Sequence, residues 1–134
     1  MDISVHDNRL ISYCVLSETH EIRMHTIYED REPYEYTDVV FSGVVAYYFE
    51  QDTFKTILFD IEEEDIARIY DSNRDRFAAG QNYGWPGMWN KSEQTALEYL
   101  ASLGVKGFTL SSVCGMSGWV LAKSMSKFDA SSLL

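Results

Sequence analysis

The densest run of β-branched and aromatic residues lies at residues 38–61, which read DVVFSGVVAYYFEQDTFKTILFDI. Polar residues interrupt this run once, at Glu50, Gln51 and Asp52. The pattern predicts two strands joined by a tight polar turn. In the first arm, apolar side chains occupy both odd and even positions. A strand that is apolar on both faces is covered on both faces, so we expect this arm to be central in its sheet.

Two further strands are predicted before this run. Residues 9–17 form the first strand and residues 20–28 the second, which alternates as a strand with one solvated face does. Residues 29–37, EDREPYEYT, form an acidic loop in which Pro33 excludes a central strand. Four strands are therefore expected before any helix.

The spacing of apolar residues changes from that of a strand to that of a helix at Asp60. Asp60 and Glu63 have the spacing of a capping box, and the acidic run 62–65 would lie at the positive end of a helix dipole. Helical spacing then continues through about residue 78. Residues 71–73 leave open a division into two short helices.

A second helix and a closing hairpin complete the predicted elements. The helix is expected to begin at Asn90 and to end at Gly104. Residues 105–113 and 117–123 predict two paired strands. The tail 124–134 is small and polar, and we expect it to fray.

Together these elements predict one α+β domain over residues 1–134. Its sheet should be curved, mostly antiparallel and built of about six strands, with closure toward a barrel as one outcome and about two or three helices on one side. The chain of 134 residues can bury a core without disulfides or a metal. Cys14 and Cys114 lie far apart in apolar contexts, so we expect two buried free thiols.

The net charge of −10 is concentrated in one part of the chain. Residues 29–65 hold twelve acidic residues against Arg31 and Lys55, so this segment carries the whole net charge. Such a field repels nucleic acid and anionic membranes and attracts a basic protein partner. No apolar run is long enough to span a bilayer, and the first residues lack the features of a signal peptide. A cytoplasmic protein is the resulting expectation.

The sequence predicts no catalytic residue, no metal site and no cofactor, so we expect a protein that is not an enzyme. His20 and His25 would point to opposite faces of a strand and could not share a metal ion. Ser117 follows Gly115 and Met116, but the full pattern of a nucleophile elbow is absent. The glycines of residues 80–87 lack the lysine of a phosphate-binding loop.

Two groups of residues are candidates for binding a partner. Aromatic side chains crowd into the loop at residues 80–90, where they either fold back over the core or serve as anchors for a partner. The acidic clusters either solvate the surface and cap a helix or form a docking surface. The candidate partner-binding residues are Glu29, Asp30, Glu32, Glu35, Asp38, Glu62, Glu63, Glu64, Asp65, Tyr83, Trp85 and Trp89.

Two segments resemble a group of known proteins. They are SSVCGMSGWVLAK at residues 111–123 and VVFSGVVAYYF at residues 39–49. Both resemble small uncharacterised bacterial proteins, some of which are encoded beside polymorphic toxins and are regarded as immunity proteins. The resemblance implies a protein-binding role, in which an acidic surface would cover the basic active site of a toxin domain.

These observations rank three hypotheses of function. The first is a protein-binding module, plausibly an immunity protein that neutralises a basic toxin domain. The second is a small-molecule-binding or hydrolytic domain with a pocket inside the curved sheet, where Tyr47, Tyr48 or Cys14 would point. The third is a homodimer whose interface uses Trp85 and Trp89.

Overall fold

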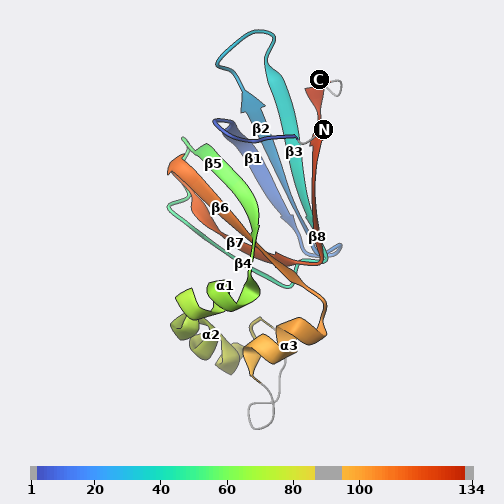
Figure 1. Ribbon diagram of the computed structural model, residues 1–134, viewed down its shortest axis with the longest axis vertical. Helices are drawn as coiled ribbons and strands as arrows, with labels where there is room; N and C mark the ends of the chain where they lie inside the picture. Colours follow the sequence, from blue (N-terminus) through green and yellow to red (C-terminus); the bar gives the residue numbers. More distant parts are fainter. Residues whose placement is uncertain (1–2, 87–94, 132–134) are drawn as a thin grey trace.

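The computed structural model describes residues 3–86 and 95–131, which form one antiparallel sheet flanked by short helices (Figure 1). Eight strands of the described residues follow the order β4-β7-β6-β5-β1-β2-β3-β8 across the sheet. The strands are β1 (Arg9–Leu16), β2 (Glu21–Tyr28), β3 (Glu35–Ser42), β4 (Ala46–Glu50), β5 (Ile57–Glu64), β6 (Lys106–Cys114), β7 (Ser117–Ala122) and β8 (Ser124–Asp129).

The α+β class and the antiparallel sheet are confirmed, but the number of strands is not. The sheet has eight strands in the described residues, where the sequence pattern predicted about six. It is not closed into a barrel, because β4 and β8 form its two edges. One additional strand comes from the predicted hairpin and the other from the predicted tail.

The first arm of the predicted hairpin is divided between two strands. Gly43 turns the backbone between β3 and β4 with a φ of +65°, a conformation that glycine adopts without steric cost. β3 pairs with β2 and with β8, so the central position expected of this arm is confirmed for β3. The prediction of a hairpin across residues 50–52 is wrong. The bend at Gly43 carries β4 to the far edge of the sheet, where it pairs with β7.

The tail predicted to fray instead begins with an ordered strand. β8 pairs with β3 along its whole length, from Ser42 opposite Ser124 to Thr37 opposite Asp129. The small polar side chains misled the prediction because they lie on the solvated face of an edge strand. Met125 packs against the core from the other face.

The sheet is bent into two layers that face each other (Figure 1). One layer contains β1, β2, β3 and β8, and the other contains β5, β6, β7 and β4. The layers join where Arg9 of β1 pairs with Ile57 of β5. They join again where the chain passes from β3 to β4 and from β7 to β8, and there the amide of Lys123 donates to the carbonyl of Ser42 at 3.0 Å.

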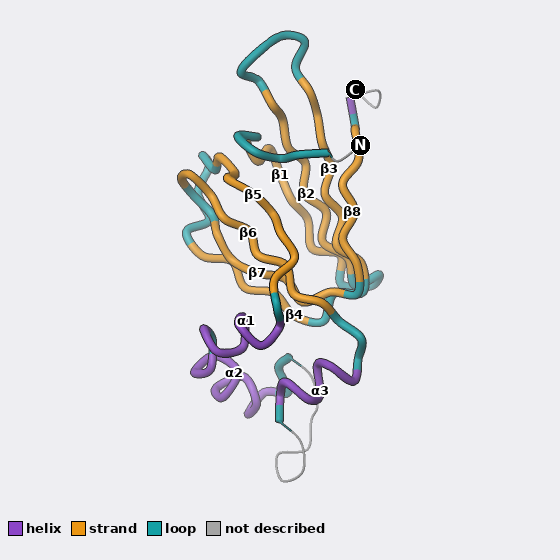
Figure 2. Tube along the Cα trace, in the orientation of Figure 1, coloured by secondary structure: helices purple, strands orange, loops and turns teal. Residues whose placement is uncertain are grey.

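The larger core fills the space between the two layers. Phe41 from β3 contacts Phe108 from β6, with 5.7 Å between the ring centroids. The segment before β1 crosses between the layers (Figure 2) and inserts Val5, which is fully buried. The buried members of this core are Val5, Leu10, Ile22, Met24, Val39, Phe41, Leu58, Ile61, Phe108, Leu110, Met116, Val120 and Ala122.

A second core lies between the helices and the outer face of the β4–β7–β6 layer (Figure 1). On β7, Val120 points into the larger core while Trp119 and Leu121 point toward the helices. The ring of Phe77 stacks on both Trp119 and Trp85, with centroids 5.8 and 5.1 Å apart. The helices that supply this core are α1 (Ile66–Ser72), α2 (Arg74–Gly80), the 3-10 turn η1 (Gln81–Tyr83) and α3 (Ala96–Ser102).

The first helix begins later than the sequence pattern predicted. Asp60 and Glu63 lie in β5, because pairing with β6 continues the strand to Glu64. Asp65 is the true N-cap, since its carboxylate accepts a hydrogen bond of 2.9 Å from the amide of Ala67. The alternative of two short helices is confirmed, with Asn73 between them.

The second predicted helix agrees with α3 at its end. Its predicted start at Asn90 lies outside the described residues, and α3 is capped by Thr95, whose hydroxyl accepts from the amide of Glu98. Leu103 follows as the C-cap, and Gly104 adopts a left-handed φ of +71°. The prediction that the helix ends at Gly104 is therefore confirmed.

Candidate functional site

The predicted partner-binding residues lie in separate parts of the structure. One acidic group lies on the long loop between β2 and β3, and a second lies at the end of β5 that leads into α1 (Figure 1). Asp38 lies on β3, and Tyr83 and Trp85 follow α2. Trp89 lies outside the described residues. The acidity that is contiguous in sequence is therefore distributed over several places in the molecule.

Part of the charge on the β2–β3 loop is neutralised within the chain. The guanidinium of Arg9 donates to both carboxylate oxygens of Glu29, at 2.7 and 3.3 Å. These hydrogen bonds lower the pKa of Glu29 and raise the pKa of Arg9. Arg31 lies 3.7 Å from Glu35 across the same loop. Asp30 and Glu32 are exposed and form no ion pair among the described residues.

The second acidic group forms what we call the acidic ridge, which consists of Asp60, Glu62, Glu63, Glu64 and Asp65. Asp60, Glu62 and Glu64 share one face of β5, Glu63 lies on the other, and Asp65 follows where the chain passes into α1. The basic side chains near them are Lys106, 3.8 Å from Glu63, and Arg68, 3.8 Å from Glu64. Both of these cations are more than half exposed, so water screens the two pairs.

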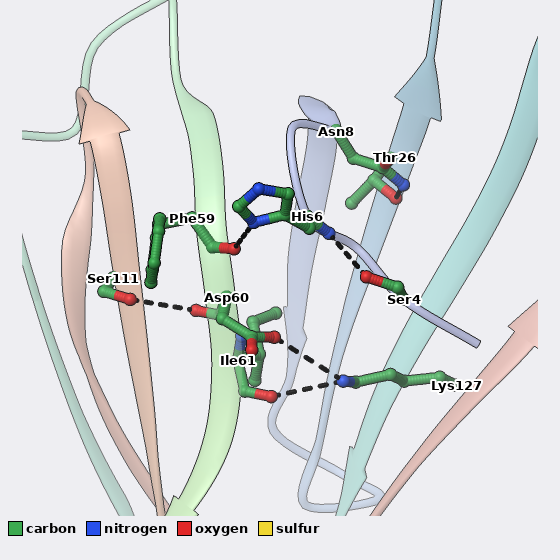
Figure 3. Close-up of polar contacts among 9 residues, drawn as sticks. All are labelled: Ser4, His6, Asn8, Thr26, Phe59, Asp60, Ile61, Ser111 and Lys127. Atoms are coloured by element: carbon green, nitrogen blue, oxygen red, sulfur yellow. Dashed lines mark hydrogen bonds and ion pairs between the residues drawn. The ribbon is translucent and has the colours of Figure 1, made fainter. Parts of the chain in front are cut away.

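Lys127 connects the ridge to the opposite layer. Its ammonium reaches from β8 to β5, where it donates to the carbonyl of Ile61 at 3.2 Å and lies 4.0 Å from a carboxylate oxygen of Asp60 (Figure 3). The side chain of Lys127 is only 19 % exposed. The same carboxylate of Asp60 accepts a hydrogen bond from the amide of Ile61 at 2.8 Å.

Beyond its pairing with β1 at Ile57, the side of β5 that faces away from β6 is contacted by side chains rather than by a strand. The imidazole Nδ1 of His6 hydrogen-bonds to the carbonyl of Phe59 at 2.8 Å, as Lys127 does to that of Ile61 (Figure 3). His6 also contacts the Phe59 ring edge-on, with centroids 5.1 Å apart. Side chains that cover an exposed strand edge prevent it from pairing with a strand of another molecule.

Glu62 carries the clearest electrostatic signature of the ridge. Its pKa is raised above the ordinary value, first by a hydrogen bond with Asp60 and then by the charge of that neighbour. Lys127 acts in the opposite direction but does not offset this effect. The two carboxylates are therefore crowded enough that one retains its proton more readily than an isolated glutamate does.

The aromatic residues of the 80–90 loop divide between the two interpretations. Trp85 is packed against Phe77 and Trp119, so it caps the second core. Tyr83 is 89 % exposed and does not cover the core. Met88 and Trp89 lie outside the described residues. Of the two tryptophans in the homodimer hypothesis, the structure describes only Trp85, which is partly exposed.

The residues named for an interior pocket and the two cysteines can now be placed. A cluster of buried hydrophobic side chains lies between the layers, where one hypothesis had placed a pocket. Tyr48 points instead toward the helices, and Tyr47 is 39 % exposed. Cys14 and Cys114 are free, as expected, but both are exposed, which corrects the prediction that they are buried. Cys14 lies opposite the charged Arg23, and Cys114 ends β6 at a turn.

Two exclusions hold within residues 3–86 and 95–131. No group of three or more His, Cys, Asp or Glu side chains in these residues could hold a metal ion. No helix there is long and apolar enough to cross a membrane.

Sequence analysis missed the role of Lys127 because it lies in the segment predicted to fray. The alternation of Ser124, Met125, Ser126 and Lys127 was a usable signal, since it places methionine and lysine on one face of a strand. The hydrogen bond of 2.6 Å from the hydroxyl of Tyr13 to Asp52 had no sequence signal. It joins β1 to the loop after β4, two segments far apart in the sequence.

Neither protein-family models, nor curated proteins, nor solved structures gave a match to this chain.

Proposed function

We propose that this chain is a protein-binding module whose acidic ridge on β5 engages a basic partner. The observation that carries the proposal is the excess of carboxylates over cations at the ridge. Five acidic side chains occupy residues 60–65, while Lys106, Arg68 and Lys127 are the cations near them. Exposed ion pairs contribute little in water, so the ridge keeps a negative potential that attracts a basic surface.

The crowding of Asp60 and Glu62 supports the same proposal. A lysine or arginine of a partner would relieve the repulsion that raises the pKa of Glu62. Binding should therefore lower that pKa and release a proton. We expect the affinity for a basic partner to increase as the pH rises through the range in which Glu62 ionises.

The immunity-protein resemblance suggests the kind of partner. A toxin domain with a basic active site would be steered to the ridge and inhibited by its carboxylates. Tyr83, which is 89 % exposed, would supply apolar contact area at the edge of such an interface.

The experiment compares two variants that change the net charge equally. Glu62→Gln with Glu63→Gln removes two charges from the ridge, and Asp30→Asn with Glu32→Asn removes two from the β2–β3 loop. The probe is a decalysine peptide, and its association rate is measured at low and at moderate salt. We expect the ridge variant to bind several-fold more slowly at low salt and to show a flatter salt dependence, while the loop variant stays near wild type.

The same pair of variants then serves as bait in a lysate. Recovery of a basic protein by wild type and by the loop variant, but not by the ridge variant, would support the proposal. Equal association rates and equal recovery for both variants would overturn it.

A second candidate function is favoured by a surface groove. The groove has a volume of about 350 Å³ between the β1–β2 turn and the start of β4, and Trp85 lies at its side. Val15, Leu16 and Tyr47 line it and are 43, 36 and 39 % exposed. A small apolar molecule could bind there, and a change in tryptophan fluorescence on titration with an alkyl alcohol series would test this. The absence of any saturable change would exclude it.

A further inference from the structure

The outer face of the β1–β2–β3–β8 layer carries polar side chains in register. No helix among the described residues covers this face, because the helices pack on the other layer (Figure 1). Ser12 of β1 lies directly opposite His25 of β2, and His25 lies directly opposite Asp38 of β3. Directly opposite residues of an antiparallel pair share a face, with Cβ atoms about 5 Å apart.

A β-bulge in β1 creates this alignment. The register shifts between Leu10 and Ser12, so that Leu10 pairs with Thr26 and Ser12, not Ile11, pairs with His25. Without the extra residue, an isoleucine would face the imidazole. Bulges that re-aim a side chain in this way are frequent next to active sites.

The contact between His25 and Asp38 orients the imidazole and favours a proton on Nδ1. Nδ1 of His25 lies 2.9 Å from a carboxylate oxygen of Asp38, whose side chain is 15 % exposed. An ionised carboxylate only accepts hydrogen bonds, so the ring nitrogen that bonds to it is a protonated one. In the neutral tautomer with its proton on Nδ1, Nε2 has a free lone pair, which is the arrangement of the histidine in a serine hydrolase. The imidazole is 43 % exposed and accessible from solvent.

An apolar hollow adjoins the three side chains. It has a volume of about 340 Å³, and Ile11, Tyr36 and Ala130 line it together with Ser12, His25 and Asp38. The bulge contributes Ile11 to its wall, with 47 % of that side chain exposed. A hollow of this size and lining accommodates a small apolar acyl group.

We propose that Ser12, His25 and Asp38 form a nucleophilic serine site that acts on small esters with an apolar acyl group. Oγ of Ser12 attacks the ester carbonyl carbon, and its proton passes to Nε2 of His25. The bond to the leaving alcohol breaks, and the alcohol takes that proton. Water then attacks the acyl-serine by the same route and releases the acid. Asp38 orients the imidazole and stabilises its charge without touching the substrate, which makes it a positioning residue.

This activity does not rest on the proposed binding function, because the site lies on the outer face of the other layer. It would add chemistry to a chain that the sequence predicts not to be an enzyme. It also gives Asp38, a predicted partner-binding carboxylate, a role within the chain.

The test uses the full chain with two probes, p-nitrophenyl acetate and a fluorophosphonate. We expect hydrolysis of the ester, and a single fluorophosphonate adduct that mass spectrometry locates on Ser12. Ser12→Ala should abolish ester hydrolysis and fluorophosphonate labelling, and His25→Ala should slow each reaction by at least about 100-fold. Ser126→Ala is the matched control, because Ser126 is exposed on the same face but lies opposite Val40. It should leave both rates unchanged.

Asp38→Asn separates positioning from a structural role. It should lower kcat while leaving KM near that of wild type, with an unchanged circular dichroism spectrum. An adduct on other residues, no adduct at all, or ester hydrolysis that persists in Ser12→Ala would overturn the proposal.

Discussion

The two layers of the bent sheet differ in what covers their outer faces. On the β4–β7–β6 layer, helices bury Trp119 and Leu121 beneath Phe77 and Trp85. On the β1–β2–β3–β8 layer, the outer face carries Ser12, His25 and Asp38 in contact with solvent. On the outer faces, apolar packing is therefore confined to the covered layer, and exposed polar side chains occupy the uncovered one. Exposed strand positions tolerate polar side chains because no packing depends on them.

The largest expected effect comes from deleting an aromatic ring in the covered layer. Phe77 is 1 % exposed, so Phe77→Ala should lower the free energy of unfolding by about 3–5 kcal/mol. The same deletion at Phe128 on the uncovered layer, where the side chain is 38 % exposed, should cost less than about 1.5 kcal/mol. Urea denaturation measures both variants. Equal costs would contradict the conclusion that only the outer face of the covered layer is packed.

A close backbone contact at the edge of the covered layer gives the next effect. A Cβ atom at Gly118 would collide with the carbonyl oxygen of Tyr48 on β4. Gly118→Ala should therefore separate β4 from β7 and cost about 1–3 kcal/mol in thermal or chemical unfolding. Ser117→Ala, the neighbouring change on β7, should have little effect. If both variants unfold like wild type, β4 is not held closely against β7.

Lys127 gives a smaller effect, at the contact between the layers. Lys127→Met keeps the aliphatic stem but leaves the carbonyl of Ile61 without its donor, so it should cost about 1–2 kcal/mol. Lys106→Met is the control, because Lys106 is 58 % exposed beside Glu63 and should change stability by less than about 0.5 kcal/mol. A comparable loss of stability in both variants would show that the hydrogen bond from Lys127 to β5 contributes no more than an exposed ion pair does.

The smallest effect is a pH dependence at Tyr13. Its hydrogen bond to Asp52 raises the pKa of the phenol to about 12, above the ordinary value of 10.0. A raised folded-state pKa means that the stabilisation is complete below pH 10 and is lost as the pH rises through about 12. The stability advantage of wild type over Tyr13→Phe should therefore shrink across that range in denaturation at successive alkaline pH values. A constant difference would contradict the assignment.

Most strands and helices could be predicted from sequence, but their partners could not. β1 and β2 lie where strands were predicted at residues 9–17 and 20–28, and Gly104 follows the C-cap of α3 with a left-handed φ, as expected of a terminating glycine. Alternation shows which face of a strand is buried but not which strand lies beside it. The pairing of β4 with β7 depends on the bend at Gly43, and a single glycine within an apolar run does not reveal its φ.

The candidate sites were predicted less completely than the fold. The ridge residues were identified by their charge, although Asp60 to Glu64 lie on a strand and not at a helix start. The alignment of Ser12, His25 and Asp38 could not be predicted, because it requires both the register of three strands and the bulge at Ile11. A shift of one residue would have placed these side chains on opposite faces.

The corner where β3 passes into β4 and β7 passes into β8 has a consequence for folding kinetics. There, residues 42–46 lie against residues 121–124, which are separated from them by more than half of the chain. The β1–β2–β3 hairpins can form early from local contacts, whereas β3 waits for β8 before its second side is paired. Contacts between such distant segments slow folding, because a long loop must close first. We therefore expect slow folding, in which one side of β3 stays unpaired until β8 reaches it.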